Sequence, residues 1–266
     1  MIEAERIGEL NREPARDGRY VLYWMQASQR ADYNYALEYA IEQANELNRP
    51  VVVGFGLTDD YPEANARHYA FMLEGLCETA RDLEERGIRF VLRRGAPPEV
   101  ALELAGDACL LVADKGYLRR QKAWRREVAG SAKCRVAEVE SDAVIPVETA
   151  SIKEEYAAAT LRPKLHKLLS NYLTGMRPKE VRKDSLGLKL GGESAADPAA
   201  LLDQLAVDRS VPPVSDRFRG GPSEAQRLLR NFIRTKLDDY PDARNDPALD
   251  ALPVLEGEAR RQVDIG

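Results

Sequence analysis

Apolar runs and helical patterns alternate along residues 19–139 of this chain. The first run, 19–24, reads RYVLYW and is typical of a buried strand. The next segment, 32–47, has apolar or small residues at helical spacing and ends before Pro50, which favours a helix. The same alternation continues for about 90 residues. It predicts strands at 19–24, 51–57, 88–92, 108–113 and 135–139, and helices at 32–47, 65–86, 97–105 and 118–129.

The predicted strands are apolar at successive positions instead of alternating between apolar and polar residues. Strands of this kind are buried on both faces, which is typical of a parallel sheet covered by helices on either side. The sequence therefore predicts an α/β fold, with a Rossmann-like five-stranded parallel sheet and helices on both faces.

The pattern changes after Val147. Residues 148–173 are expected to be helical or irregular, and 186–215 contain the glycines and prolines of a linker. A helix is expected to follow, with Ser223 as its N-cap and a stripe of Leu228, Leu229, Phe232, Ile233 and Leu237. Residues 251–266 show little periodicity and are expected to fray. The predicted divisions are 1–18, an N-terminal extension; 19–150, the α/β domain; 151–217, a basic segment and interdomain linker; and 218–266, the start of a helical domain.

Composition narrows the class of protein. The 266 residues carry a net charge of −5 and 44% hydrophobic residues, as ordinary globular proteins do. No run approaches the roughly 20 apolar residues of a membrane span, and the first 19 residues lack the apolar core of a signal peptide. The three cysteines have neither disulfide nor metal spacing, which favours a reducing cytoplasm.

One segment departs from the overall charge, because residues 151–190 have a net charge of +5. It is either a strip that faces phosphates or a solvated linker rich in lysine and arginine. Only Tyr156 and Tyr172 interrupt it with aromatic rings, which favours the linker.

Polar side chains gather where the predicted strands end. Ligands of open parallel sheets bind beyond the carboxyl ends of the strands, near the point where the strand order reverses. Trp24 and Met25 could form a flat wall there, or Trp24 could belong to the core. No glycine-rich phosphate loop follows the first strand, and the two histidines, His68 and His166, predict no metal site. No catalytic residue is predicted.

Many short motifs resemble the class II cyclobutane pyrimidine dimer photolyases. The first is Tyr23-Trp-Met-Gln-Ala-Ser-Gln-Arg30, and another is Asp114-Lys-Gly-Tyr117. Both lie at predicted strand ends, and the motifs keep the family's order over nearly all of 19–250. Further examples are Tyr33-Asn-Tyr-Ala-Leu-Glu-Tyr-Ala40, Val53-Gly-Phe-Gly-Leu-Thr-Asp59, Lys153-Glu-Glu-Tyr156, Leu161-Arg-Pro-Lys164 and Gly220-Gly-Pro-Ser-Glu-Ala225.

The resemblance implies a DNA-repair lyase that acts on UV-damaged DNA. In that family the α/β domain can hold a light-harvesting antenna, often a deazaflavin, and a helical domain holds FAD and the flipped dimer. Excited reduced FAD supplies the electron that splits the cyclobutane ring. Tyr240 is similar to an FAD-contacting tyrosine. The resemblance and the strand-end positions together indicate antenna contacts from Met25, Gln26, Ser28, Arg30, Thr58, Asp114, Lys115 and Tyr117.

After Asp250 the sequence departs from the family pattern that begins the flavin cradle. The expectation is a chain truncated before most of the FAD-binding domain. A separate chain would then have to supply that domain for repair. An antenna-binding module and an inactive fragment are the alternatives.

Overall fold

The computed structural model describes residues 2–246, which divide into two compact units. Of these residues, the first unit comprises 2–57 and 83–193, and the second comprises 58–82 and 194–246. These units cut across the divisions expected from the sequence, because residues 58–82 of the predicted α/β domain group with the later part of the chain.

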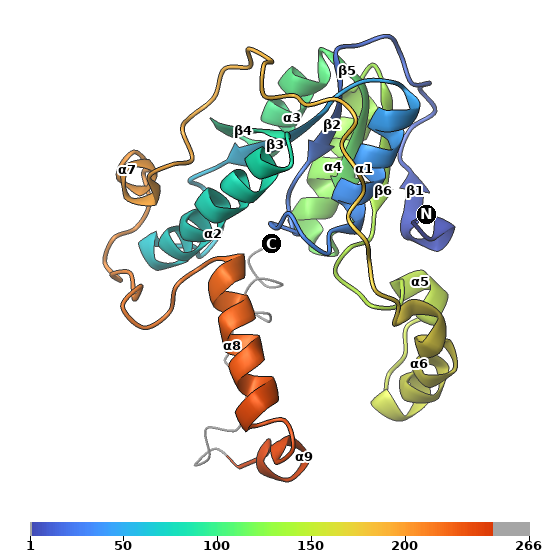
Figure 1. Cartoon of the computed structure of the whole chain (residues 1–266), viewed down its shortest axis with the longest axis vertical. Coiled ribbons are helices and arrows are strands. Elements are labelled where there is room, and N and C mark those ends of the chain that lie inside the picture. Colours follow the sequence, from blue (N-terminus) through green and yellow to red (C-terminus); the bar gives the residue numbers. More distant parts are fainter. Residues whose placement is uncertain (1, 247–266) are drawn as a thin grey trace. The chain divides into compact units, whose positions relative to one another are not determined.

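The first unit contains a six-stranded sheet with the order β1-β6-β5-β2-β3-β4. Five strands run parallel, and β1 pairs with β6 in the antiparallel direction. The predicted α/β fold is confirmed, with one strand more than expected (Figure 1). The strands are β1 (Ile7–Glu9), β2 (Tyr20–Trp24), β3 (Val51–Leu57), β4 (Arg89–Arg94), β5 (Ala108–Asp114) and β6 (Arg135–Val139).

The central strands are buried along their whole length, as the apolar runs predict. Every residue of β2, β3 and β5 is buried. The helices of this unit begin and end within a few residues of the predicted positions where a prediction was made. They are α1 (Tyr35–Glu46), α3 (Pro97–Ala105), α4 (Arg119–Ser131), α5 (Val147–Ala150) and α6 (Ala158–Tyr172).

Helices cover both faces of the sheet. Tyr20, Leu22 and Trp24 belong to one hydrophobic cluster with residues of α3 and α4. The hydroxyl of Tyr23 instead meets Asn34, the N-cap of α1. Because successive residues of a strand face opposite sides, α1 lies on the face opposite α3 and α4. The structure thus places Trp24 in the core.

The sixth strand comes from the segment expected to be an N-terminal extension. Arg6, which precedes β1, is 1% exposed. Its guanidinium donates to the carbonyls of Ala143 (2.9 Å) and Val144 (2.7 Å) and lies 3.8 Å from the ring centre of Tyr35. Hydrogen bonds to a charged donor and a cation–π contact hold this segment against the sheet edge.

Two glycines let α3 approach β3 closely. A Cβ on Gly56 would lie 2.7 Å from the Cα of Pro97, and one on Gly54 would lie 2.6 Å from a methyl group of Leu104. Glycine in a strand interior often marks such a close approach.

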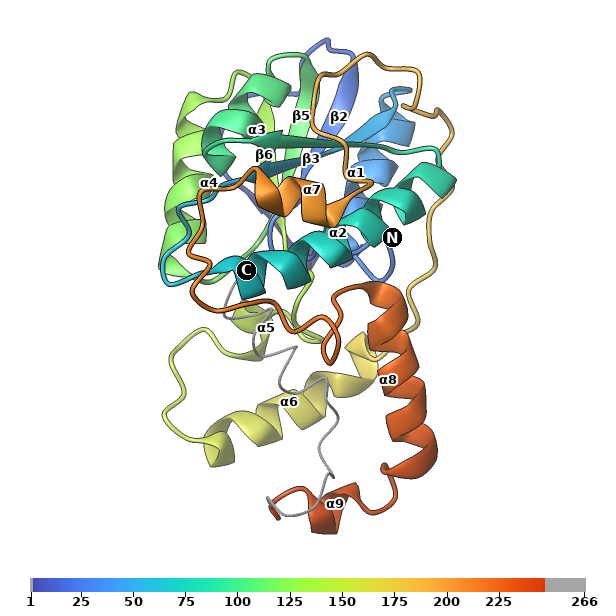
Figure 2. The same ribbon diagram turned by 90° about the vertical axis from the view of Figure 1, so that its left-hand side faces the viewer.

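The second unit contains most of α2 (Ala66–Glu85), together with α7 (Pro198–Asp203), α8 (Pro222–Thr235) and α9 (Tyr240–Ala243). These last three are drawn in orange to red in Figure 2. The expected cap of α8 is wrong, because the N-cap is Gly221 and Ser223 lies inside the helix. The amide of Ser223 donates to the carboxylate of Glu78 on α2 (2.8 Å). The residues expected to fray, 251–266, lie outside the described part.

Candidate functional site

The strand order places the candidate site at the ends of β2 and β5. From β2 the chain continues outward through β3 and β4, then returns to form β5 and β6 on the other side of β2. The order therefore reverses between β2 and β5, where open α/β sheets bind their ligands. Gln26 follows β2, and Asp114 ends β5.

Asp114 anchors the loop that follows β2. Its carboxylate accepts hydrogen bonds from the Tyr23 hydroxyl (2.8 Å) and from the backbone amides of Gln26 (2.8 Å) and Ser28 (3.0 Å). Burial and, secondly, the charge of Asp142 raise the pKa of Asp114 to about 6, and the three donors oppose that shift. Asp114 is 1% exposed, so it orients this loop through internal bonds.

Asn34 extends the network to α1. Its side-chain amide donates to the Tyr23 hydroxyl (2.9 Å) and to the carbonyl of Ser28 (2.9 Å), and its oxygen caps α1 through the amide of Leu37 (2.9 Å). Burial, followed by the charge of Asp114, raises the pKa of Tyr23 well above its usual value. The Tyr23 hydroxyl therefore remains protonated and serves as a hydrogen-bond link.

The other end of the loop is tied to the segment after β6. Ser28 donates through its hydroxyl to Asp142 (2.8 Å). Arg30 donates to the carbonyls of Tyr33 (3.2 Å) and Ser141 (3.1 Å). The loop from 25 to 34 is thus fixed by buried polar contacts to Asp114 and by partly buried ones to the segment after β6.

Gln26 is the exception within this network. Its side chain is buried, with the residue 7% exposed, yet neither its carboxamide oxygen nor its nitrogen has a hydrogen-bond partner. The Nε1 of Trp24 is likewise buried without a partner. Most buried polar groups in proteins are paired, so an unpaired carboxamide at the point where the strand order reverses is a candidate contact for a ligand edge that both donates and accepts.

The structure separates the predicted antenna residues into three groups. Met25, Ser28 and Asp114 are buried supports of the loop, and Met25 donates its backbone amide to the Gly54 carbonyl (3.0 Å). Gln26 and Arg30 belong to the same loop. Thr58 belongs to the second unit, where its hydroxyl donates to Asp60 (2.5 Å). The remaining pair, Lys115 and Tyr117, lines a cavity beside α4.

That pair is bound to carboxylates. The Lys115 ammonium lies 3.0 Å from Glu148 and 4.0 Å from Glu138. Burial, with a hydrogen bond to Glu140 as the next cause, raises the pKa of Tyr117 well above its usual value. Lys115 and its carboxylate partners therefore form a charged wall, and the Tyr117 hydroxyl beside them stays protonated and neutral.

The described residues do not form a flavin site. Tyr240, the one residue that resembles an FAD contact, lies in α9 with its ring 5.5 Å from the ring of Phe232, edge to face. One tyrosine of a four-residue helix supplies neither a phosphate contact nor a pocket for the isoalloxazine ring. No step of the chemistry is therefore assigned to residues of this part of the chain.

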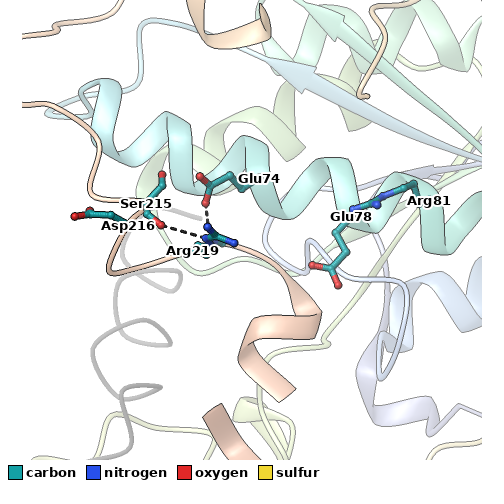
Figure 3. A pocket seen from close by; sticks show the side chains of 7 residues that line it. Glu74, Glu78, Arg81, Ser215, Asp216 and Arg219 are labelled. Carbon is teal, nitrogen blue, oxygen red and sulfur yellow. Dashed lines mark hydrogen bonds between the residues drawn. The ribbon is translucent and has the colours of Figure 1, made fainter. Parts of the chain in front are cut away.

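A second cavity, of about 430 Å³, lies in the second unit beside α2. Figure 3 shows Glu74 and Glu78 on α2, facing the loop that carries Arg219. Glu74 accepts the amide of Gly220 (2.8 Å), and Glu78 accepts that of Ser223 (2.8 Å). Since both carboxylates hold the start of α8, this cavity is part of the helix anchor.

Other classes of site find no support in residues 2–246. No cluster of histidine, cysteine and carboxylate side chains there could hold a metal ion. Cys77, Cys109 and Cys134 are buried free thiols, and burial raises the pKa of each. None of the helices in this part is both long and apolar enough to cross a membrane.

Some cations of the basic segment, residues 151–190, form ion pairs or hydrogen bonds within the first unit. Lys164 pairs with Glu155, Lys179 with Glu42 (3.0 Å), and Lys183 donates to the carbonyl of Asn48 (2.9 Å). These contacts account for three of its nine cations, and whether the others contact phosphates stays a prediction.

The sequence interpretation missed Tyr23, Asn34 and Arg125. Asn34 could have been found, because an asparagine before a helical pattern is a frequent N-cap. The sequence near Tyr23 and Arg125 does not indicate their roles. Only the fold brings Tyr23 to Asp114, and only the fold places Arg125 of α4 beside Glu138 in the wall of a cavity.

Comparisons with known proteins agree with this fold. The chain is 47% identical over 253 residues to a deoxyribodipyrimidine photo-lyase of Methanothermobacter thermautotrophicus, covering 95% of this chain and 56% of that protein. It is 32% identical over 235 residues to the photo-lyase of Arabidopsis thaliana, covering 85% and 47%. The chain thus spans about half the length of these relatives.

Solved structures share the architecture. A class III photolyase from Agrobacterium tumefaciens superposes with a TM-score of 0.67 at 18% identity, covering 93% of this chain and 51% of that one. A Synechocystis cryptochrome gives 0.63 at 15% identity, covering 85% and 49%. At these identities the likeness defines the fold: the α/β architecture of photolyases and cryptochromes. The DNA photolyase family matches residues 21–183, more than half of the chain, and the chain belongs to that family.

Proposed function

We propose that this chain is part of a class II deoxyribodipyrimidine photolyase, which splits cyclobutane pyrimidine dimers in UV-damaged DNA by light. The observation that carries the proposal is the match to photo-lyases along nearly the whole chain. The assignment to class II is supported by the motifs at the strand ends that resemble that class. FAD, when bound, supplies the electron for this chemistry. Repair requires flavin-binding residues beyond those described, on the same polypeptide or on a partner chain.

The role of the described residues is to hold the loop that follows β2, residues 25–34, and an antenna chromophore. The unpaired carboxamide of Gln26 offers an NH2 group that donates and a carbonyl oxygen that accepts, which match the edge of a deazaflavin-type heterocycle. Arg30 lies on the same anchored loop and could contact an anionic tail. Asp114 orients both through the loop backbone. Three buried free thiols fit a reducing compartment such as the cytoplasm.

A chimera tests the repair function. Residues 1–246 of this chain would replace the matching part of the Methanothermobacter relative, which supplies the remaining half. The purified chimera, loaded with FAD, would be illuminated with an oligonucleotide that contains one thymine dimer. We expect light-dependent loss of the dimer, measured by chromatography, and none in the dark. A chimera that is folded and holds FAD but does not repair the dimer in light would refute the proposal.

A further inference from the structure

A cavity of about 550 Å³ lies in the first unit beside α4, and Gln26 is not among the residues that line it. Its other walls come from the segment after β5, from β6 and from α5. Four cations line it, against two carboxylates, Glu138 and Glu148. The cations are Lys115, Lys122, Arg125 and Arg126.

The two carboxylates neutralise only two of the cations. Arg125 Nε lies 2.9 Å from Glu138, and Lys115 lies 3.0 Å from Glu148. Lys122 and Arg126 are exposed on α4, and within residues 2–246 neither has a carboxylate at ion-pair distance. The cavity therefore carries a net charge of +2.

Arg125 supplies a second, independent observation. The residue is 6% exposed, and its Nη2 donates to the carbonyl of Gly116 (2.7 Å). Its Nη1 is buried and has no hydrogen-bond partner. Leaving the donor of a buried cation unpaired is unfavourable, so the wall of this cavity has unused capacity for an acceptor.

The rest of the lining is uncharged. Tyr117 is 39% exposed, and Leu10, Ala129 and Gly130 complete the surface. The Lys122 ammonium lies 5.7 Å from the centre of the Tyr117 ring. A ring stacked on Tyr117 would place an attached anion near Lys122.

We propose that this cavity binds a phosphate monoester of a flat ring, of mononucleotide size. A phosphate monoester carries a charge of roughly −1.5 to −2 near neutral pH, which matches the net charge of the cavity better than a carboxylate does. Guanidinium and ammonium groups are the usual partners of phosphate. A volume of 550 Å³ lies within the range of small-molecule sites. The site goes beyond the repair function, although Lys115 and Tyr117 also belong to the predicted antenna set.

Calorimetry on the full chain tests the proposal, with AMP, adenosine and inorganic phosphate as probes. We expect AMP to bind at least about ten-fold more tightly than either of the other two, because it alone engages both the cations and the ring. Its affinity should fall as the salt concentration rises. Failure of AMP to bind at about 5 mM, or equal binding of AMP and adenosine, would overturn the proposal.

Variants locate the binding. The double substitution Lys122→Gln and Arg126→Gln removes the two cations without carboxylate partners, and both side chains are exposed, so the fold should persist. We expect at least about ten-fold weaker AMP binding. Arg119→Gln is the matched control, since Arg119 is an exposed cation of α4 outside the cavity lining. Equal effects of control and double variant would overturn the assignment.

Tyr117→Leu tests the ring contact. It should weaken AMP binding and leave the binding of inorganic phosphate unchanged. Tyr117→Phe, which keeps the ring but loses the hydroxyl bonded to Glu140, should bind AMP as the unaltered chain does. If Tyr117→Leu binds AMP normally, the ring contact is wrong.

Discussion

The carboxylate of Asp114 accepts a hydrogen bond of 2.8 Å from the hydroxyl of Tyr23 on the neighbouring strand. The two residues lie on β5 and β2, the pair of strands between which the strand order reverses. Asn34 continues the link to α1. The position where this fold opens a ligand crevice is therefore held by buried polar bonds between three elements.

The buried Asp114 predicts a pH dependence of stability. Its pKa is about 6 in the folded chain against 3.8 for an ordinary aspartate. Because the folded state holds this proton more tightly, its contribution to stability is complete below about pH 4 and is lost as the pH rises through about 6. A shift of about two units corresponds to a decrease on the order of 3 kcal/mol in the free energy of unfolding.

Asp114→Asn isolates this contribution. Asparagine keeps an oxygen for the amides of Gln26 and Ser28 but does not titrate. We expect the unfolding free energy of the unaltered chain, measured by urea titration at several pH values, to fall between pH 4 and 6.5 relative to that of Asp114→Asn. Parallel pH profiles for the two proteins would contradict the raised pKa.

Gly56 should not tolerate a side chain. In Gly56→Ala the new Cβ would lie 2.7 Å from the backbone of Pro97, so α3 would have to move away from β3. We expect a loss of about 1–3 kcal/mol in the free energy of unfolding. Gly130→Ala, also in the first unit, is the control: its Cβ meets nothing within 4 Å, and alanine in a helix should add about 0.5–1 kcal/mol. Equal effects of the two substitutions would refute the close approach.

Glu78 acts as an external cap of α8. Glu78→Ala removes the acceptor for the Ser223 amide, so the first turn of α8 should lose about 1 kcal/mol. Hydrogen exchange of that turn should then be about five-fold faster. The control is Glu84→Ala, because Glu84 is an exposed acid of α2, the helix that also carries Glu78. This substitution should leave the hydrogen exchange of the first turn of α8 unchanged. Unchanged exchange in Glu78→Ala would show that the cap contributes nothing.

Periodicity predicted the central sheet because its strands are buried on both faces and leave apolar runs. The predicted strand 51–57 and helix 97–105 match β3 and α3 residue for residue. The edge strand β1 was missed, since three residues of mixed polarity leave no such signal. The cap of α8 was predicted incorrectly because the carboxylate that replaces Ser223 comes from Glu78, about 145 residues earlier.

The sequence predicted where the candidate site lies, but not what each of its residues does. Strand ends identified the loop after β2 and the end of β5, which the structure brings together. The sequence could not show that the carboxylate of Asp114 accepts three internal hydrogen bonds while the carboxamide of Gln26 makes none. Such pairing depends on neighbours that only the folded chain brings together. Lys115 was predicted together with the loop after β2, but its ammonium group pairs with Glu148 of α5.

Gln26→Leu tests the antenna proposal most directly. Leucine replaces an unpaired buried carboxamide with an apolar side chain of similar size, so the free energy of unfolding should stay the same or rise. Because the proposal has the carboxamide bind the chromophore, the same substitution should also abolish the deazaflavin-type absorption band. The band is measured on the chain purified from a host that makes deazaflavin. Gln43→Leu on α1 is the control and should keep the band. A Gln26→Leu chain that retains the chromophore, with stability equal to or above that of the unaltered chain, would show that Gln26 does not hold the antenna.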